Sequence, residues 1–188
     1  MAKSGYASKI DQSVFIEMHR GVDTSQAIEA LQSLSAGQCA GIISDAGLPC
    51  VADPGSVVVE LAQQMGIRVV PLPGPSSIMM ALMASGMNGQ QFAFHGYLSR
   101  ETHDRRKSLQ KLQMEVAKTG ITQIFMETPY RNEAMLKDIL SVCQSEIRLC
   151  IAMDISGPYE YIRSQSIAEW KKHLPKFYKN PAIFVMGR

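Results

Sequence analysis

Short apolar runs alternate with amphipathic stretches along most of the chain. The runs "CAGIIS" (39–44) and "IRVVPL" (67–72) are bounded by glycine and proline, a pattern typical of buried strands. Between them, "SVVVELAQQMG" (56–66) predicts a helix that ends at its glycine, and a second helix is predicted over 73–89. The order strand, helix, strand, helix predicts a parallel sheet with right-handed crossovers.

The pattern changes near residue 97. A long charged helix is predicted over 98–120, and the rest of the chain again alternates between strands and helices. The predicted strands are 121–127, 147–153, 159–166 and 182–187, with helices over 130–143 and through Trp170. The fold class is therefore α/β, and we predict two α/β domains, residues 1–97 and 98–188.

The beginning of the chain does not fit this scheme. Residues 1–12 carry no strand pattern, and the first predicted helix covers 24–37. Because two strands make an incomplete parallel sheet, we expect the first domain to lack an N-terminal strand unit.

Composition excludes several classes of protein. The 188 residues are 46% hydrophobic and 19% charged, which argues against disorder, and a net charge of +2 does not by itself indicate nucleic-acid binding. No CxxC pair and no metal-type histidine spacing is present, so no metal site is expected; Cys39 and Cys150, in apolar runs, are expected to be buried thiols. With no signal peptide and no apolar run near 18 residues, we expect a cytoplasmic protein without membrane contact.

Two glycine-rich turns follow the first two predicted strands. "SDAGLP" (44–49) and "PGPSS" (73–77) leave backbone amides bare, and ligands of open α/β sheets bind beyond the carboxyl ends of strands. We therefore expect the two turns to converge on a ligand, although a pair of plain turns is the alternative. Neither turn is a phosphate-binding motif, and Asp45 and Asp53 favour a ligand with positive charge.

These turns carry a resemblance. "GIISDAGLPCVADPG" (41–55) and "GIRVVPLPGPSS" (66–77) are similar to the tetrapyrrole-methylase fold family of S-adenosylmethionine-dependent methyltransferases, and most similar to its 16S ribosomal RNA cytidine 2′-O-ribose methyltransferase branch. The resemblance runs from about residue 36 to 140 and is looser in "FAFHGYL" (92–98) and "IFMETPYRNEAMLKDI" (124–139). It implies a homodimer, S-adenosylmethionine as cofactor and ribosomal RNA as substrate.

The resemblance also implies site residues. Carried over motif by motif, the cofactor contacts would be Ala46, Gly47, Leu48, Val51, Ser76, Ser77, Met126, Asp154, Pro181 and Ala182. Asp45 and Glu127, with Asp154, end predicted strands and are candidates for a general base or electrostatic partner. A capping or turn carboxylate is the alternative for each of them.

Other features leave the substrate open. "AMDISGPYE" (152–160) lacks the arginine and lysine of the RNA branch, and "NPA" (180–182) is closer to the corrin and porphyrin enzymes. A tetrapyrrole or other small-molecule C- or N-methyltransferase, or a non-catalytic paralogue or fragment, are therefore alternatives. Tyr130 and Arg131 could clamp a nucleotide or simply open a helix, and the basic run 100–107 could touch RNA or be a solvated helix face.

Overall fold

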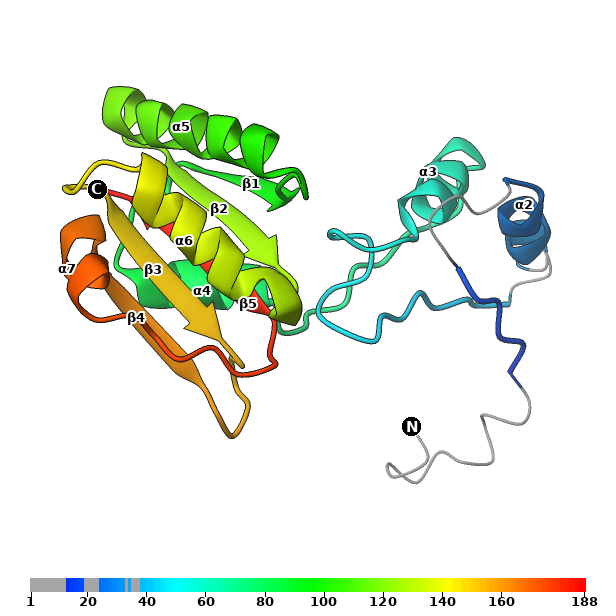
Figure 1. Cartoon of the computed structure of the whole chain (residues 1–188). Helices are drawn as coiled ribbons and strands as arrows, with labels where there is room; N and C mark the ends of the chain where they lie inside the picture. The colour runs from blue at the N-terminus through cyan, green and yellow to red at the C-terminus, as the bar shows by residue number, and fades with distance from the viewer. Residues whose placement is uncertain (1–12, 19–23, 33, 35–37) are drawn as a thin grey trace. The chain divides into compact units, whose positions relative to one another are not determined.

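The computed structural model describes residues 13–18, 24–32, 34 and 38–188, and the chain divides into two compact units, Met1–Gly74 and Pro75–Arg188 (Figure 1). Residues 1–12, for which the sequence predicts no strand, lie outside the described residues. The helix α4 and the strand β1, described below, belong to the second unit. The division into two domains at residue 97 stays a prediction.

In its described residues, the first unit has the helices α2 (Thr24–Gln32) and α3 (Ser56–Gln64), which pack against each other. Both helices were predicted, and they bury Leu31 and Ala62. The apolar positions of these short helices therefore serve mainly to join them.

The two strands predicted in the first unit are wrong. Residues 39–44 and 67–72 form no strand and pair with none in the described part of the chain, so the predicted parallel sheet does not form there. A strand needs a neighbour that satisfies its backbone N–H and C=O groups, and apolar side chains need a covering layer. Without either, Ile43, Val70 and Leu72 are exposed, and Cys39, expected to be buried, is exposed as well.

The second unit is built on a five-stranded sheet with the order β1-β2-β5-β3-β4. Its strands are β1 (Phe92–Tyr97), β2 (Thr122–Glu127), β3 (Arg148–Met153), β4 (Tyr161–Ser166) and β5 (Ala182–Gly187). The last four were predicted within a few residues, whereas β1 was not predicted. Only β1 and β2 are parallel, and the other neighbours are antiparallel, so the sheet is mixed.

Helices cover both faces of this sheet (Figure 1). Alternate residues of the central strands point to opposite faces, as the pleat requires. One face packs against α5 (Thr102–Thr119), α6 (Asn132–Val142) and α7 (Ile167–Lys172), and the other against α4 (Ser77–Ser85). The α/β class is therefore confirmed.

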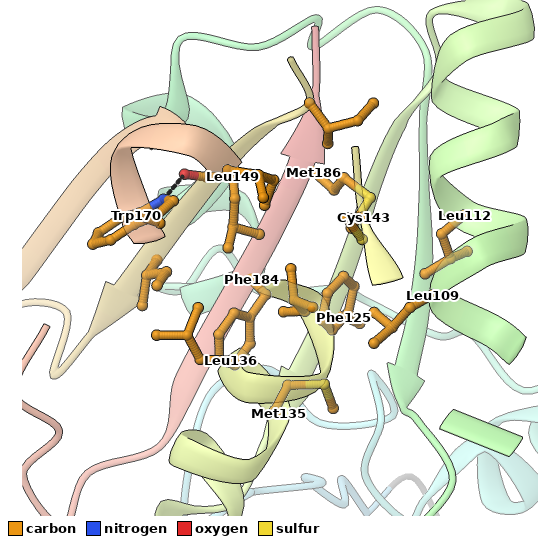
Figure 2. Packing of buried hydrophobic residues seen from close by; sticks show 14 of the residues in the cluster. Leu109, Leu112, Phe125, Met135, Leu136, Cys143, Leu149, Trp170, Phe184 and Met186 are labelled. Atoms are coloured by element: carbon orange, nitrogen blue, oxygen red, sulfur yellow. Dashed lines mark hydrogen bonds between the residues drawn. The ribbon is translucent and has the colours of Figure 1, made fainter. Parts of the chain in front are cut away.

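The larger core lies between the sheet and α5, α6 and α7 (Figure 2). Phe125 on β2 and Phe184 on β5 are register partners, and their rings stack with centroids 5.5 Å apart. Trp170, fully buried on α7, donates its indole N–H to the carbonyl of Leu149 at 2.9 Å. That hydrogen bond satisfies the one polar group of a large apolar side chain and fixes α7 on β3.

Most of the basic run 100–107 is solvated, as one of the two interpretations expected, but Arg105 is not. Arg105 is buried and donates hydrogen bonds to Asp138 of α6 and, through Nη1, to the carbonyl oxygens of Ser99 and Arg100. Arg106 donates from Nε to the other oxygen of Asp138 at 2.7 Å. A carboxylate supplied by a different helix therefore draws part of the basic run into the interior.

Candidate functional site

The loop 44–55 of the first unit has an unusual backbone. Gly47, Cys50 and Ala52 all have positive φ, at 79°, 67° and 57°. The left-handed region is costly for residues that carry a Cβ, and such residues are concentrated at ligand-binding sites. Asp45, Ala46 and Gly47 are exposed at the tip, so the predicted cofactor-contacting turn is solvent-accessible.

The hydroxyl of Ser44 shapes the start of this loop. Its Oγ donates to the carbonyl of Ala46 at 3.1 Å and accepts from the Ala46 N–H at 3.3 Å. Further along, the N–H of Val51 donates to the carbonyl of Leu48 at 3.3 Å. These local bonds hold the turn without any strand beside it.

Gly74 of the second glycine-rich turn lies close to Leu48 of the first, and both residues belong to the first unit. A Cβ built on Gly74 of the second turn would lie 3.2 Å from Cδ2 of Leu48 in the first. The missing side chain at Gly74 thus permits close approach to Leu48, while nothing lies within 4 Å of a Cβ at Gly47. Among the described residues, the first turn therefore has open space beside Gly47, whereas Gly74 of the second turn occupies the space beside Leu48.

In the second unit, five predicted residues lie at the ends of the three central strands, β2, β5 and β3. Ala182, the first residue of β5, is the register partner of Glu127 on β2 and of Met153 on β3. Met126 pairs with Ile183 one step inward, Pro181 precedes Ala182, and Asp154 follows Met153. The strand ends therefore bring together Met126, Glu127, Asp154, Pro181 and Ala182.

Ser76 and Ser77 stand at the start of α4. Ser76 is the N-cap residue: its Oγ accepts from the N–H of Met79 at 3.4 Å, and Ser77 is the first helical residue. Because the first N–H groups of a helix have no partner within it, this position offers hydrogen-bond donors. The capping role of Ser76 is a structural reason for a serine there, independent of any ligand.

Glu127 is held rather than free. Its Oε1 accepts from the N–H of Thr128 at 2.7 Å and from Nε and Nη2 of Arg131 at 2.9 and 2.6 Å. The Glu127 side chain is fully buried, and its Oε2 has no partner among the described residues. A carboxylate bound this way is better suited to orienting Arg131 than to accepting a substrate proton.

Asp154 shapes the turn between β3 and β4. It has a φ of 49°, and its Oδ2 accepts from the N–H of Tyr159 at 2.8 Å. Its carbonyl accepts from the N–H of Gly157 at 2.7 Å. These contacts are those of the turn carboxylate that sequence reasoning held open as the alternative.

Asn132 is a polar residue that the sequence prediction missed. It is completely buried at the start of α6, and its Nδ2 donates to the carbonyl of Asn180 at 2.8 Å. Its Oδ1 has no hydrogen-bond partner among the described residues. Since buried acceptors are nearly always satisfied, Oδ1 of Asn132 and Oε2 of Glu127 are two acceptors available to a ligand or water at this end of β2. The sequence signal that could have indicated Asn132 was its position directly after Tyr130 and Arg131.

Among the residues that the structure describes, no group of three or more histidine, cysteine or acidic side chains could hold a metal ion. In the same residues, no helix combines the length and apolar character needed to cross a bilayer.

The architecture defines the class to which this chain belongs. The solved methyltransferase CobJ shares the fold, with a TM-score of 0.59 and 18% identity over 97% of this chain and 81% of that one. A family model described as tetrapyrrole (corrin/porphyrin) methylases matches residues 13–170. The chain belongs to this family, which confirms the resemblance found in the sequence.

Curated relatives share substantial identity with the chain. The ribosomal RNA small subunit methyltransferase I of Pseudomonas aeruginosa is 40% identical over 139 residues, 74% of this chain and 48% of that protein. The protein of the same name from Vibrio cholerae is 34% identical over 152 residues, 81% of this chain and 51% of that protein. The chain thus spans about half the length of these relatives.

Proposed function

We propose that this protein is an S-adenosylmethionine-dependent methyltransferase that methylates a ribose 2′-hydroxyl of small-subunit ribosomal RNA. The observation that carries the proposal is the identity of 30–40% with relatives named ribosomal RNA small subunit methyltransferase I, over most of the chain. The fold likeness to CobJ adds no substrate, because at 18% identity it reflects architecture alone. A homodimer and a cytoplasmic location are parts of the same proposal.

The proposed cofactor contacts are the residues named from the sequence. In the first unit they are Ala46, Gly47, Leu48 and Val51, and in the second Ser76, Ser77, Met126, Asp154, Pro181 and Ala182. The positive φ values of the 44–55 loop and the meeting of Leu48 with Gly74 support a binding role for the first set. The shared strand ends support Met126, Asp154, Pro181 and Ala182 of the second set.

The chemistry of the available groups fits S-adenosylmethionine. When bound, the cofactor supplies an electrophilic methyl group on a positively charged sulfonium, together with ammonium, hydroxyl and amino donors. Each unit offers acceptors for such donors: the first has the exposed carboxylate of Asp45, and the second has Glu127 Oε2 and Asn132 Oδ1, which have no partner among the described residues. Negative charge at Asp45 also suits a cationic ligand better than a phosphate.

The different surroundings of Asp45 and Glu127 support different proposed roles for the two carboxylates. Asp45 is exposed, and we propose it as the electrostatic partner or general base, because its carboxylate is accessible to a reacting hydroxyl. Glu127 is committed to Arg131, and we propose it as a positioning residue that aims the guanidinium. Much of the catalysis of methyl transfer is alignment of the acceptor with the methyl group, so a positioned Arg131 can contribute without proton transfer.

Methyl transfer to RNA tests the proposal. The chain is incubated with tritiated S-adenosylmethionine and unmodified small-subunit ribosomal RNA, with the Pseudomonas aeruginosa relative as positive control. The expected result is tritium in the RNA at a single ribose, where the adjacent phosphodiester bond resists alkaline hydrolysis because its 2′-hydroxyl is methylated. Label in the control reaction but none with this chain contradicts the proposal.

Two variants separate the proposed roles. Asp45→Asn is expected to lower kcat at least tenfold, since a lost general base affects the chemical step, and also to weaken cofactor binding, since it removes the negative charge proposed to face the cationic cofactor. Glu127→Gln is expected to leave the pH profile of kcat unchanged while lowering kcat/KM for RNA. A pH profile that flattens in Glu127→Gln would return the general-base role to Glu127.

A further inference from the structure

The segment that leads into β5 is strongly basic and carries aromatic residues. Between Lys171 and Lys179, "KKHLPKFYK" holds four lysines, a histidine and two aromatic side chains, with no acidic residue. All four lysines are exposed. The sequence prediction did not single out this segment, and the proposed catalytic roles do not use it.

Two tyrosines from separate loops form one aromatic surface beside these lysines. Tyr159, in the β3–β4 connection, and Tyr178, in the basic segment, have ring centroids 6.0 Å apart with an interplanar angle of 27°. Nζ of Lys176 lies 5.7 Å from the centroid of the Tyr178 ring. Tyr159 remains 66% exposed and Tyr178 51% exposed, so the pair is open to a partner.

The backbone around this tyrosine pair is anchored on both sides. The N–H of Tyr159 donates to Asp154 at 2.8 Å, and the carbonyl of Asn180 accepts from the buried Asn132 at 2.8 Å. Phe177, between Lys176 and Tyr178, packs against the main hydrophobic core. Because Phe177 packs inward while its neighbours Lys176 and Tyr178 are exposed, the loop holds these two side chains in defined positions on the surface.

Three acidic side chains in the same loops and in α7 reduce, but do not cancel, the positive charge of the four lysines. Besides Asp154, whose carboxylate binds the Tyr159 N–H, the adjacent acids are Glu160 and Glu169. Glu160 accepts from the N–H of Ser156 at 2.7 Å, and Glu169 accepts from the N–H of Ser166 at 2.8 Å. Each of these carboxylates is therefore directed to a backbone amide within its own turn.

We propose that Tyr159, Tyr178, Lys176 and Lys179 form a binding surface for single-stranded RNA. An exposed aromatic pair offers a stacking face to any unpaired base, while the lysines neutralise the phosphates on either side of it. A duplex hides its base faces, so this surface favours single strands. The surface depends on the proposed function only for the identity of the RNA, which we take to be the ribosomal substrate.

The position of the surface agrees with a role in substrate binding. Tyr159 lies five residues after Asp154, and Tyr178 lies three residues before Pro181. Both loops therefore enter or leave the strand ends that hold the candidate site residues. RNA stacked on the tyrosines would extend along the edge where Asp154 and Ala182 lie.

Binding of a fluorescein-labelled 12-nucleotide single-stranded RNA to the 188-residue chain, measured by anisotropy without cofactor, tests the inference. Tyr178→Leu is expected to raise the Kd at least about fivefold, since one stacked base contributes about 1–3 kcal/mol. Tyr178→Phe keeps the stacking ring and is expected to bind the RNA with the affinity of the wild-type chain. The double variant Lys176→Gln/Lys179→Gln is expected to reduce the salt slope of log K by about 1.4.

Lys111→Gln/Lys118→Gln is the matched control, because it removes two exposed lysines of α5 and the same net charge. Equal loss of affinity in the two double variants, or equal affinity for single-stranded and duplex RNA, overturns the inference. Thermal unfolding of Tyr178→Leu identifies any loss that comes from misfolding. The binding assay contains no cofactor and is therefore independent of catalysis. If the chain binds RNA in this assay but transfers no methyl group in the methyl-transfer assay, only the proposed function is contradicted. If Tyr178→Leu is fully active in the methyl-transfer assay, only this surface is contradicted.

Discussion

Arg105 of α5 and Asp138 of α6 form a buried ion pair that joins the two helices over the sheet. The same guanidinium donates to the carbonyl oxygens of Ser99 and Arg100, where the chain turns from β1 into α5. Asp138 also binds Arg106, so it holds two cations at the entry to the helix. One acidic side chain therefore anchors the start of α5 to α6.

Asp138→Asn is expected to destabilise the second unit by about 3–5 kcal/mol, because it leaves the buried Arg105 without its counter-charge. Urea denaturation followed by the fluorescence of Trp170, the single tryptophan, measures this in the unit concerned. Glu115→Gln, an exposed change on α5, serves as the control, with an expected effect within about 0.5 kcal/mol. A small effect of Asp138→Asn would mean that water replaces the pair.

Gly47→Ala is expected to weaken binding of S-adenosylhomocysteine about 5–30-fold, as measured by isothermal titration. At a φ of 79° an alanine costs about 1–2 kcal/mol, so the loop must change conformation, although a Cβ would meet no neighbour within 4 Å. Gly41→Ala is the matched control, since that glycine has open space and no positive φ. Equal affinity in the two variants would remove Gly47 from the proposed cofactor contacts.

The four thiols are expected to differ in reactivity. Burial raises the pKa of Cys143 to about 12 and the pKa of Cys150 to about 11, whereas Cys39 is exposed. Since the thiolate is the reactive form, iodoacetamide at pH 8 should label Cys39 first and leave Cys143 and Cys150 unlabelled in the native state. Peptide mapping by mass spectrometry measures the order, and labelling of all four in urea is the control. Early labelling of Cys150 would show that the sheet opens.

Acid is expected to weaken the start of α7. Hydrogen bonds from the N–H and the hydroxyl of Ser166 lower the pKa of Glu169, which completes a capping box. A carboxylate whose pKa is lowered by folding stabilises the folded state above its unfolded pKa, and this contribution is lost as pH falls through the folded pKa. Wild type should therefore exceed Glu169→Gln in stability at pH 7 and match it at pH 3, with Trp170 fluorescence as the readout. Ser166→Ala, which removes the hydroxyl donor, should also reduce this pH dependence.

Sequence reasoning succeeded where a segment carries its own signal. The strands β3 and β5 are nearly continuous apolar runs, and β2 has an apolar centre at Ile124, Phe125 and Met126. All three strands are buried on both faces, and α6 has clear helical spacing. The strand β1 was missed because it lies at the edge of the sheet and keeps Phe92 and Tyr97 partly exposed, so its apolar pattern is weak. The predicted strands 39–44 and 67–72 failed for the opposite reason, since apolar, β-branched composition does not supply a pairing partner.

The candidate site was predictable only in part. The motif around Gly47 and the turn at Gly74 indicated that two loops meet, and the structure places Gly74 beside Leu48. The partners of Glu127 and Asp154 could not be derived, because hydrogen bonds to Arg131 and Tyr159 depend on how the chain turns after each strand. Nor does spacing alone show that Tyr159 and Tyr178 stack, because they are distant in sequence and are joined only by the fold.

The placement of β5 between β2 and β3 has a consequence for biosynthesis. β5 is the last of the five strands in sequence, yet it supplies the central hydrogen bonds that join the two halves of the sheet. A nascent chain on the ribosome can therefore form the β1–β2 and β3–β4 pairs, but cannot join them until residues 182–187 have left the exit tunnel. Until then the apolar faces of both pairs are exposed, so this is the stage of synthesis at which a chaperone would bind.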